Sequence, residues 1–261
     1  MIFPVAFVGL VLTSVASAAP TSVEPVAIDL NSTKWTPEHI LKHDEVILYG
    51  EDGRMEVVHE AVYQQLVAAN GYDLDTPDVD EDFLNKTDKA DHHLDTRASC
   101  AFTRSLITDR TENFVDWDVQ MSPVVIGTGR NGIDVYVSSG YSVSNSVTVS
   151  GSADLGFVKD RLGTTFGVSY SRTWTTATVV NIKGTVENGF SGVMITKPFK
   201  TRRYGRNLQG CIGSLRQTGT FMADSYREGS YAGVKWISGA ITMCHKREFP
   251  LTRCNGGGRF I

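Results

Sequence analysis

Hydrophobic and polar positions alternate with a period of two along much of the second half of the chain. In residues 134–155, five of the odd positions are valine, whereas the even positions are almost entirely Ser, Thr, Gly and Tyr. This period predicts strands with one apolar face and one hydroxyl-rich face. A second alternating run covers residues 166–175, and the charged segment 159–163 lies between the two runs. Together they predict one long β-hairpin.

The length of the first run is unusual. Its 22 residues at ~3.3 Å each would extend roughly 70 Å, against the ~17–20 Å of an ordinary strand. The run therefore either breaks into two or three ordinary strands, with Gly140 and Gly151 as bending points, or forms an elongated arm. An arm with two such faces suits a boundary between water and lipid, where a spanning strand needs only about 9–11 residues.

Further segments with strand composition are punctuated by glycine-containing turns, and no helical pattern of comparable strength separates them. These segments are residues 101–108, 115–126, 179–186, 192–196, 211–221 and 233–244. Residues 98–261 are therefore predicted to form a mainly β domain, either an antiparallel β-sandwich or an elongated sheet.

A small α/β unit is predicted to precede this domain, at residues 34–72. The Thr-Pro pair at 36–37 provides an N-cap and a first-turn proline for one helix. Residues 45–58 predict a hairpin around an Asp-Gly turn, and residues 60–70 predict a second helix that ends at a glycine. This helix–hairpin–helix segment is too small to be stable alone, so we expect it to dock on the second domain or to serve as a cleavable pro-segment.

Charge divides the chain at about residue 97. Residues 19–97 hold 18 acidic and 6 basic side chains, whereas residues 98–261 hold 11 acidic and 19 basic ones. Opposite charges favour intramolecular docking of the acidic N-terminal segment on the basic domain. The stretch 73–97 is strongly acidic and has few large apolar residues, which predicts a solvated linker with Arg97 as a candidate processing site.

An apolar N-terminal run that ends in Ala-Ser-Ala predicts a signal peptide over residues 1–18. The protein is therefore expected to be secreted and extracellular. Two sequons in the acidic segment, at Asn31 and Asn85, are then candidates for N-glycosylation.

Secretion also places the four cysteines in an oxidising compartment, where three pairings into two disulfides are open. We favour Cys100 with Cys211, which ties the start of the domain to its middle. The remaining pair, Cys244 with Cys254, is a short local clip.

Two resemblances follow from these patterns. The Ser/Thr alternation and the run FGVSYSRTWTTATVVNIKGTVENGFSGVMITKPFKTRRYGR resemble the membrane-insertion region of aerolysin-type pore-forming toxins, although Glu187-Asn188-Gly189 stands where those toxins often have a Pro-Gly turn. In arrangement, the mature chain is similar to fungal secreted effector-like proteins. The similar segments are WTPEHILKHDEVILYGEDGRMEVVHEAVY, SPVV, SSGYSVSNSV, DLGFVKDRL, YSRTWTT, ITKPFKTRRYGR, LQGC and LTRC. This resemblance implies an extracellular protein of a plant-associated or insect-associated fungus, and it brings no catalytic residues.

Signatures of catalysis are weak. His245 is the only histidine after residue 97 and no nucleophile elbow occurs, which argues against a hydrolase with a histidine-based triad. Cysteines and histidines lack zinc-site spacing, so neither a metal nor another cofactor is expected. The best carboxylate pair for a carbohydrate-active hydrolase is Asp116 and Asp118, which flank Trp117.

The strongest binding candidate is the basic segment 197–206, in which two aromatic residues interleave with five cations. Its proposed binding residues are Lys197, Lys200, Arg202, Arg203, Tyr204 and Arg206. Such a segment attracts anionic lipids, acidic glycans and phosphates, and secretion argues against nucleic acid as the physiological partner. A solvated or edge-protecting strand and a docking face for the acidic segment are the structural alternatives.

These observations favour a secreted, non-enzymatic, effector-like or toxin-like protein. The expected partner is a host or competitor cell-surface component: an anionic lipid, a glycan or a protein. Self-association and insertion of the hairpin at residues 140–176 would make the protein membrane-active. The alternatives are a secreted carbohydrate-active hydrolase and a soluble inhibitor of a host protein.

Overall fold

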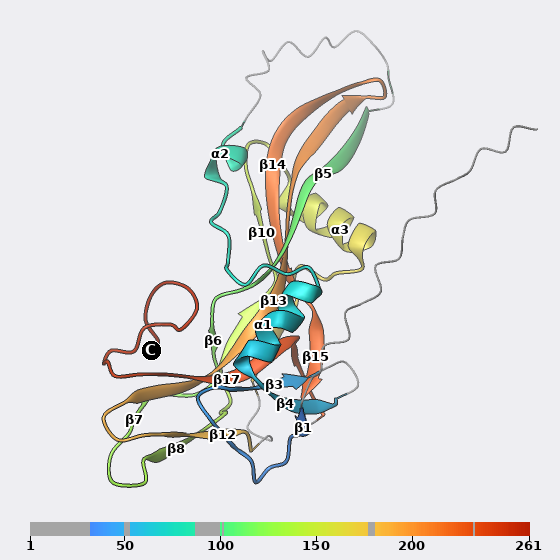
Figure 1. Ribbon diagram of the computed structural model, residues 1–261. Helices are drawn as coiled ribbons and strands as arrows, with labels where there is room; N and C mark the ends of the chain where they lie inside the picture. Colours follow the sequence, from blue (N-terminus) through green and yellow to red (C-terminus); the bar gives the residue numbers. More distant parts are fainter. Residues whose placement is uncertain (1–31, 50–52, 87–99, 101, 177–180, 232) are drawn as a thin grey trace, which may run out of the picture.

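The computed structural model describes residues 32–49, 53–86, 100, 102–176, 181–231 and 233–261. The fold is mainly β, as predicted, and its principal sheet has ten strands. Figure 1 shows a body of short strands from which a long arm projects. The strands are β1 (Thr33–Lys34), β2 (Ile40–Leu41), β3 (Glu45–Tyr49), β4 (Met55–His59), β5 (Phe102–Val115), β6 (Val119–Gln120), β7 (Val125–Ile126), β8 (Ile133–Tyr136), β9 (Ser142–Ser144), β10 (Ser146–Val149), β11 (Thr173–Thr175), β12 (Lys183–Val186), β13 (Ser191–Cys211), β14 (Ser214–Tyr226), β15 (Glu228–Tyr231), β16 (Val234–Ile237) and β17 (Gly239–Lys246). The helices are α1 (Glu60–Ala69), α2 (Glu81–Leu84) and α3 (Leu155–Phe166).

β13 is the central strand of the principal sheet. Its first part pairs with β17, β6 and β7, and its second part lies between β14 and β5. β10 continues the sheet beyond β14. The second part of β13, with β5, β14 and β10, forms the long arm (Figure 1). The arm therefore corresponds to the elongated antiparallel sheet that the sequence predicts.

The long arm contains a register shift at Tyr204 and Gly205 of β13, and glycine is needed there. A Cβ atom on Gly205 would lie 2.1 Å from the Ile107 carbonyl oxygen and 2.4 Å from the Phe221 ring. Glycine at such a bulge allows two strands and an aromatic ring to approach closely.

The acidic N-terminal segment is built into the same sheet. The predicted β3–β4 hairpin forms, and β3 pairs with β17, so the strand order β1-β4-β3-β17-β13 crosses the charge boundary. The predicted helix α1 also forms, and it buries Tyr63 and Val67 in a cluster with side chains of β3 and β4. The helix expected after Thr36 is wrong: residues 40–41 form β2, because pairing with β12 outweighs a weak local capping signal.

The alternating run at residues 134–155 contains three short strands, β8, β9 and β10, in agreement with the broken-strand alternative. The predicted hairpin tip at residues 159–163 is wrong, because this segment lies inside α3. The Asp154 side chain caps the helix by accepting a hydrogen bond from the Phe157 N–H at 2.8 Å.

Both disulfides favoured from the sequence are present, and each has its Cα atoms 5.7 Å apart. Cys100–Cys211 lies at the far end of the long arm, and Cys244–Cys254 ties the C-terminal segment to β17. Two disulfides indicate an oxidising environment.

Candidate functional site

Residues 141–176 leave the body after β8, run along the long arm and return; we call them the excursion. At its base, β9 pairs with β11, with Val143 opposite Trp174. Beyond the base, β10 pairs with β14 over residues 146–149 and α3 follows. A short ladder and side-chain contacts therefore attach the excursion to the arm.

The apolar side of the excursion packs on one face of the long arm. Val158 and Leu162 of α3 are buried in one cluster with Phe221 and Ala223 of β14. Val147 of β10 joins this cluster and is partly buried. Burial of these side chains is the main non-directional attraction that holds the excursion in place.

The opposite side of the excursion's strands is rich in exposed hydroxyl groups. Every second residue of β9, β10 and β11 is a serine or threonine that faces solvent. These residues are Ser142, Ser144, Ser146, Thr148, Thr173 and Thr175. The folded protein therefore keeps the predicted two-faced pattern and covers its apolar face with other parts of the chain.

Polar anchors hold the excursion near its base. The buried Asn145 donates from Nδ2 to the Ser169 carbonyl oxygen at 2.8 Å and accepts from the Tyr226 backbone N–H at 2.8 Å. Arg172 forms an ion pair with Glu228 of β15. Several of these residues also line a surface cavity of roughly 890 Å³ at the base of the excursion.

The described part of the predicted linker, residues 73–86, is mostly exposed to solvent, as predicted, but it also lies against the other face of the long arm, where Phe83 and Leu84 pack; we call it the strap. Its Asp80 N–H donates to the Tyr204 hydroxyl at 3.0 Å. The carbonyl oxygen of Leu84, in α2, accepts from the Ser150 hydroxyl at 2.6 Å. Because Ser150 directly follows β10, the strap holds the excursion as well as the arm.

The basic segment 197–206 is part of β13 and does not form the exposed anion-binding surface that the sequence predicts. Its cations are paired with carboxylates: Lys197 with Glu60 at 2.6 Å, Lys200 with Asp116 at 2.6 Å, Arg202 with Asp224 at 2.9 Å and Arg206 with Asp109 at 2.7 Å. Arg203 lies over the Phe166 ring at 4.1 Å, and Tyr204 is fully buried. The Lys197–Glu60 pair supports the alternative in which this segment docks the acidic part of the chain.

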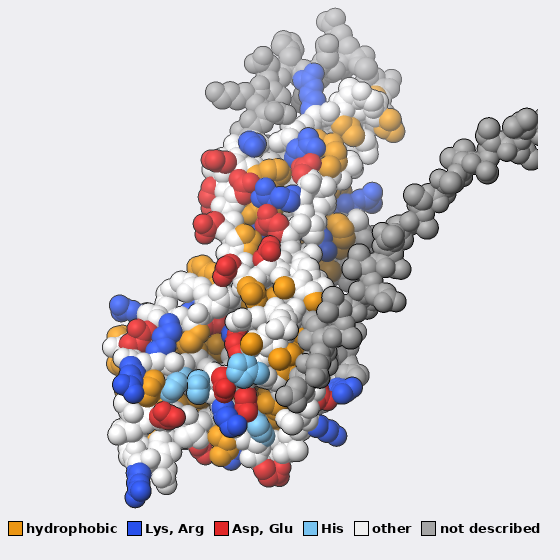
Figure 2. All heavy atoms as spheres, in the orientation of Figure 1, with side chains coloured by type: hydrophobic (Ala, Val, Ile, Leu, Met, Phe, Trp, Pro, Cys, Tyr) orange, Lys and Arg blue, Asp and Glu red, His pale blue; other side chains and the backbone are white. Residues whose placement is uncertain are grey.

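Basic and acidic side chains interleave on the visible face of the long arm, near α2 and β5 (Figure 2). Arg110 of β5 contacts Asp80 of the strap at 3.0 Å and Glu112 at 2.8 Å. The charges of the arm therefore neutralise one another locally.

Asp116, Trp117 and Asp118 connect β5 to β6 and line a cavity of roughly 360 Å³. Both carboxylates are buried, whereas Trp117 is half-exposed. The Asp116 carboxylate contacts Lys200 Nζ at 2.6 Å and accepts from the Tyr226 hydroxyl at 2.5 Å. Asp116 is thus ion-paired and hydrogen-bonded within the same cavity as Asp118, and the alternative of a carbohydrate-active hydrolase that uses this carboxylate pair stays a prediction.

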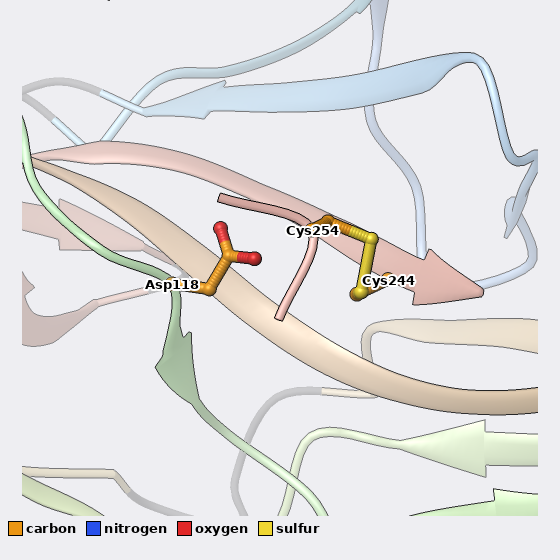
Figure 3. A group of neighbouring side chains, drawn as sticks. All are labelled: Asp118, Cys244 and Cys254. Carbon is orange, nitrogen blue, oxygen red and sulfur yellow. A yellow bond between two sulfur atoms is a disulfide. The ribbon is translucent and has the colours of Figure 1, made fainter. Parts of the chain in front are cut away.

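Asp118 lies beside the Cys244–Cys254 disulfide (Figure 3). The two sulfurs are bonded to each other, so these residues do not offer the thiolates that a metal site would use. The Asp118 Oδ2 atom accepts from the Asn255 N–H at 2.7 Å. Burial nevertheless raises the pKa of Asp118 to about 6.

The raised pKa of Asp118 predicts a pH-dependent effect of Asp118→Asn. Ionising a carboxyl whose pKa rises from 3.8 in the unfolded chain to about 6 in the folded protein costs on the order of 3 kcal/mol of stability. This cost is absent below pH 3.8 and grows as the pH rises through about 6. We therefore expect the free energy of unfolding of Asp118→Asn, relative to that of the wild type, to increase between about pH 5 and pH 7.5 in urea unfolding. A stability difference that stays the same over this range would contradict the raised pKa of Asp118.

Asn85, one of the two glycosylation candidates, is the exposed C-cap residue of α2. Asn31, the predicted signal peptide 1–18 and Arg97 lie outside the described residues.

Comparison of the chain with protein-family models, with curated proteins and with solved structures gave no match. The resemblances to aerolysin-type toxins and to fungal effector-like proteins therefore stay predictions. Within the described ranges, no helix has the length and apolar character needed to cross a membrane.

Proposed function

We propose that this is a secreted, non-enzymatic, toxin-like or effector-like protein that acts on the membrane of a host or competitor cell. Its active element is the excursion, which leaves the long arm and enters lipid as an amphipathic β-hairpin. The observation that carries this proposal is the alternation of exposed hydroxyl groups and covered apolar side chains along β9, β10 and β11.

The excursion has the length that a bilayer-crossing hairpin needs. Residues 141–149 and 168–176 contribute nine residues each, and a spanning strand needs about 9–11 residues. Its charged segment at residues 159–161 must cross the bilayer, which favours joint insertion of several copies over insertion of one. Pairing between neighbouring hairpins would also satisfy their backbone hydrogen bonds in lipid.

The way the excursion is held in the folded protein suits a reversible contact. The apolar side chains of β10 and α3 pack against β14, and Val143 of β9 and Trp174 of β11 pack in the core of the body, so movement into lipid exchanges one apolar environment for another. The ladder to be broken is short: β10 pairs with β14 over residues 146–149, and beyond it the Ser150 and Ser152 N–H groups donate to the Thr220 and Thr218 carbonyl oxygens. A surface cavity lies near Asn145 at the base.

A cell-surface component that concentrates the protein on the target membrane completes the proposal. An anionic lipid, a glycan or a protein could serve, and vesicles test the first of these directly. The internal ion pairs of residues 197–206 argue against this segment as the contact surface.

Release of a trapped fluorophore tests the proposed function. Vesicles of phosphatidylcholine, alone and mixed with phosphatidylserine, receive the full-length protein or a trypsin-nicked form. We expect release, with residues 141–176 becoming protected from added protease in the vesicle-bound state. Absence of release from both forms would overturn the membrane proposal and favour a soluble inhibitor of a host protein.

A further inference from the structure

The two residues of the Cys244–Cys254 disulfide differ in exposure. Cys244 is fully buried in a cluster with Val193, Leu251 and Phe260, whereas Cys254 is exposed. An incoming thiolate therefore approaches from the side of the exposed Cys254, with the Cys244 sulfur as the departing group. Exchange at an accessible disulfide begins with such an attack.

Asp118 places a carboxyl group next to this bond (Figure 3). A carboxylate oxygen and the two sulfurs lie within 4.8 Å of one another. Asp118 is only 2% exposed, and its Oδ1 atom has no hydrogen-bond partner among the described residues. A buried carboxyl oxygen without a partner is uncommon and calls for an explanation.

The groups that face Asp118 permit its protonation near neutral pH. Burial raises its pKa, and this effect outweighs the hydrogen bond from the Asn255 N–H and the charges of Lys197 and Arg253, which lower it. The charge of Lys197 is shared with Glu60, at 2.6 Å. Burial also raises the pKa of the neighbouring Tyr63, which stays neutral. Asp118 lines the 360 Å³ cavity, which gives it a route for proton exchange with solvent.

We propose that Cys244–Cys254 is a thiol–disulfide exchange site for a dithiol reductant, and that Asp118 protonates the departing sulfur of Cys244. This proposal is independent of the proposed membrane activity.

The exchange has two steps. One thiolate of the reductant attacks the Cys254 sulfur, the bond between the two protein sulfurs breaks, and the electron pair stays on the Cys244 sulfur. The Asp118 carboxylic acid gives its proton to that sulfur and regains one from solvent. The second thiolate of the reductant then attacks the reductant's sulfur in the mixed disulfide, and Cys254 departs and takes a proton from solvent. The reductant is oxidised to a disulfide, and the protein gains two thiols.

Reduction of the full-length folded protein by dithiothreitol tests the site, with alkylation and mass spectrometry to follow each disulfide. The rate constants for Cys244–Cys254 and Cys100–Cys211 both depend on the fraction of dithiothreitol present as thiolate, which changes with pH. Their ratio is independent of this fraction. We expect the wild-type ratio to rise about tenfold as the pH falls from about pH 8 to about pH 5, because general acids typically contribute 10²–10⁴-fold. In Asp118→Asn the ratio should be flat, and in Asp109→Asn, which removes a carboxylate on the long arm, it should keep the wild-type slope.

A second measurement needs no variant. Glutathione, which carries one thiol, should form its mixed disulfide with Cys254 and leave Cys244 as the free thiol. Glutathione on Cys244, a pH-independent ratio in the wild type, or an unchanged slope in Asp118→Asn would each overturn the proposal.

Discussion

Replacing Asp224 with asparagine lowers the free energy of unfolding by about 3–5 kcal/mol. Asp224 of β14 lies directly opposite Arg202 of β13, and both residues are 5% exposed. The carboxylate accepts hydrogen bonds from Arg202 Nε at 2.9 Å and Nη2 at 3.0 Å. Asparagine keeps a similar shape but leaves the guanidinium buried without a counter-charge, and this uncompensated charge causes the loss.

Asp109→Asn is the matched control. Asp109 of β5 pairs with Arg206 of β13, the strand that also holds Arg202, at 2.7 Å, but the side chains of Asp109 and Arg206 are 24% and 40% exposed. Loss of an exposed ion pair costs about 0–1 kcal/mol. Urea unfolding followed by circular dichroism measures both variants. A double variant, Arg202→Met with Asp224→Leu, should recover much of the loss, and equal effects of the two single variants would show that burial of the Arg202–Asp224 pair is unimportant.

The elements that the sequence predicts correctly are those decided by neighbouring residues. The β3–β4 hairpin follows from alternation around an Asp-Gly turn, and α1 follows from helical spacing that ends at Gly71. α3 is not predicted, because Gly156 and Gly163 are poor helix formers and apolar residues are few. Its capping residues, Asp154 and Gly167, are the local signal that could have identified it.

The interpretation of the basic segment fails for a different reason. Charge along the chain shows that residues 197–206 are cationic, but their partners come from β5, β14, α1 and the β5–β6 connection. Only the register of the folded sheet brings Asp224 opposite Arg202. A segment that is expected on the surface is thereby found in the centre of the principal sheet.

The excursion is predicted only in part from the sequence. Its two-faced alternation is visible in the sequence, because strand geometry alone places every second side chain on the same face. The face of β10 that is covered is determined by its packing against α3 and against Phe221 of β14. The sequence therefore identifies the candidate element but not the packed form in which it is held.

A matched pair of substitutions on adjacent residues of β10 separates membrane insertion from simple surface binding. Val147 faces the apolar cluster, and Thr148 faces solvent. In a bilayer, lysine on the lipid face costs about 2–4 kcal/mol near the midplane. We therefore expect Val147→Lys to reduce fluorophore release at least about tenfold, since ~1.4 kcal/mol corresponds to a factor of ten.

Thr148→Lys should keep release within about twofold of the wild type, because its side chain would face the water-filled side of the assembled hairpins. The added positive charge should also shift the pore toward anions in planar-bilayer conductance measurements. Thermal unfolding of both variants checks that each retains the packed excursion, because Val147 is partly buried before any lipid is present. Equal release by two well-folded variants would mean that the alternation of β10 has no role in lipid, and the excursion would then be a structural part of the long arm.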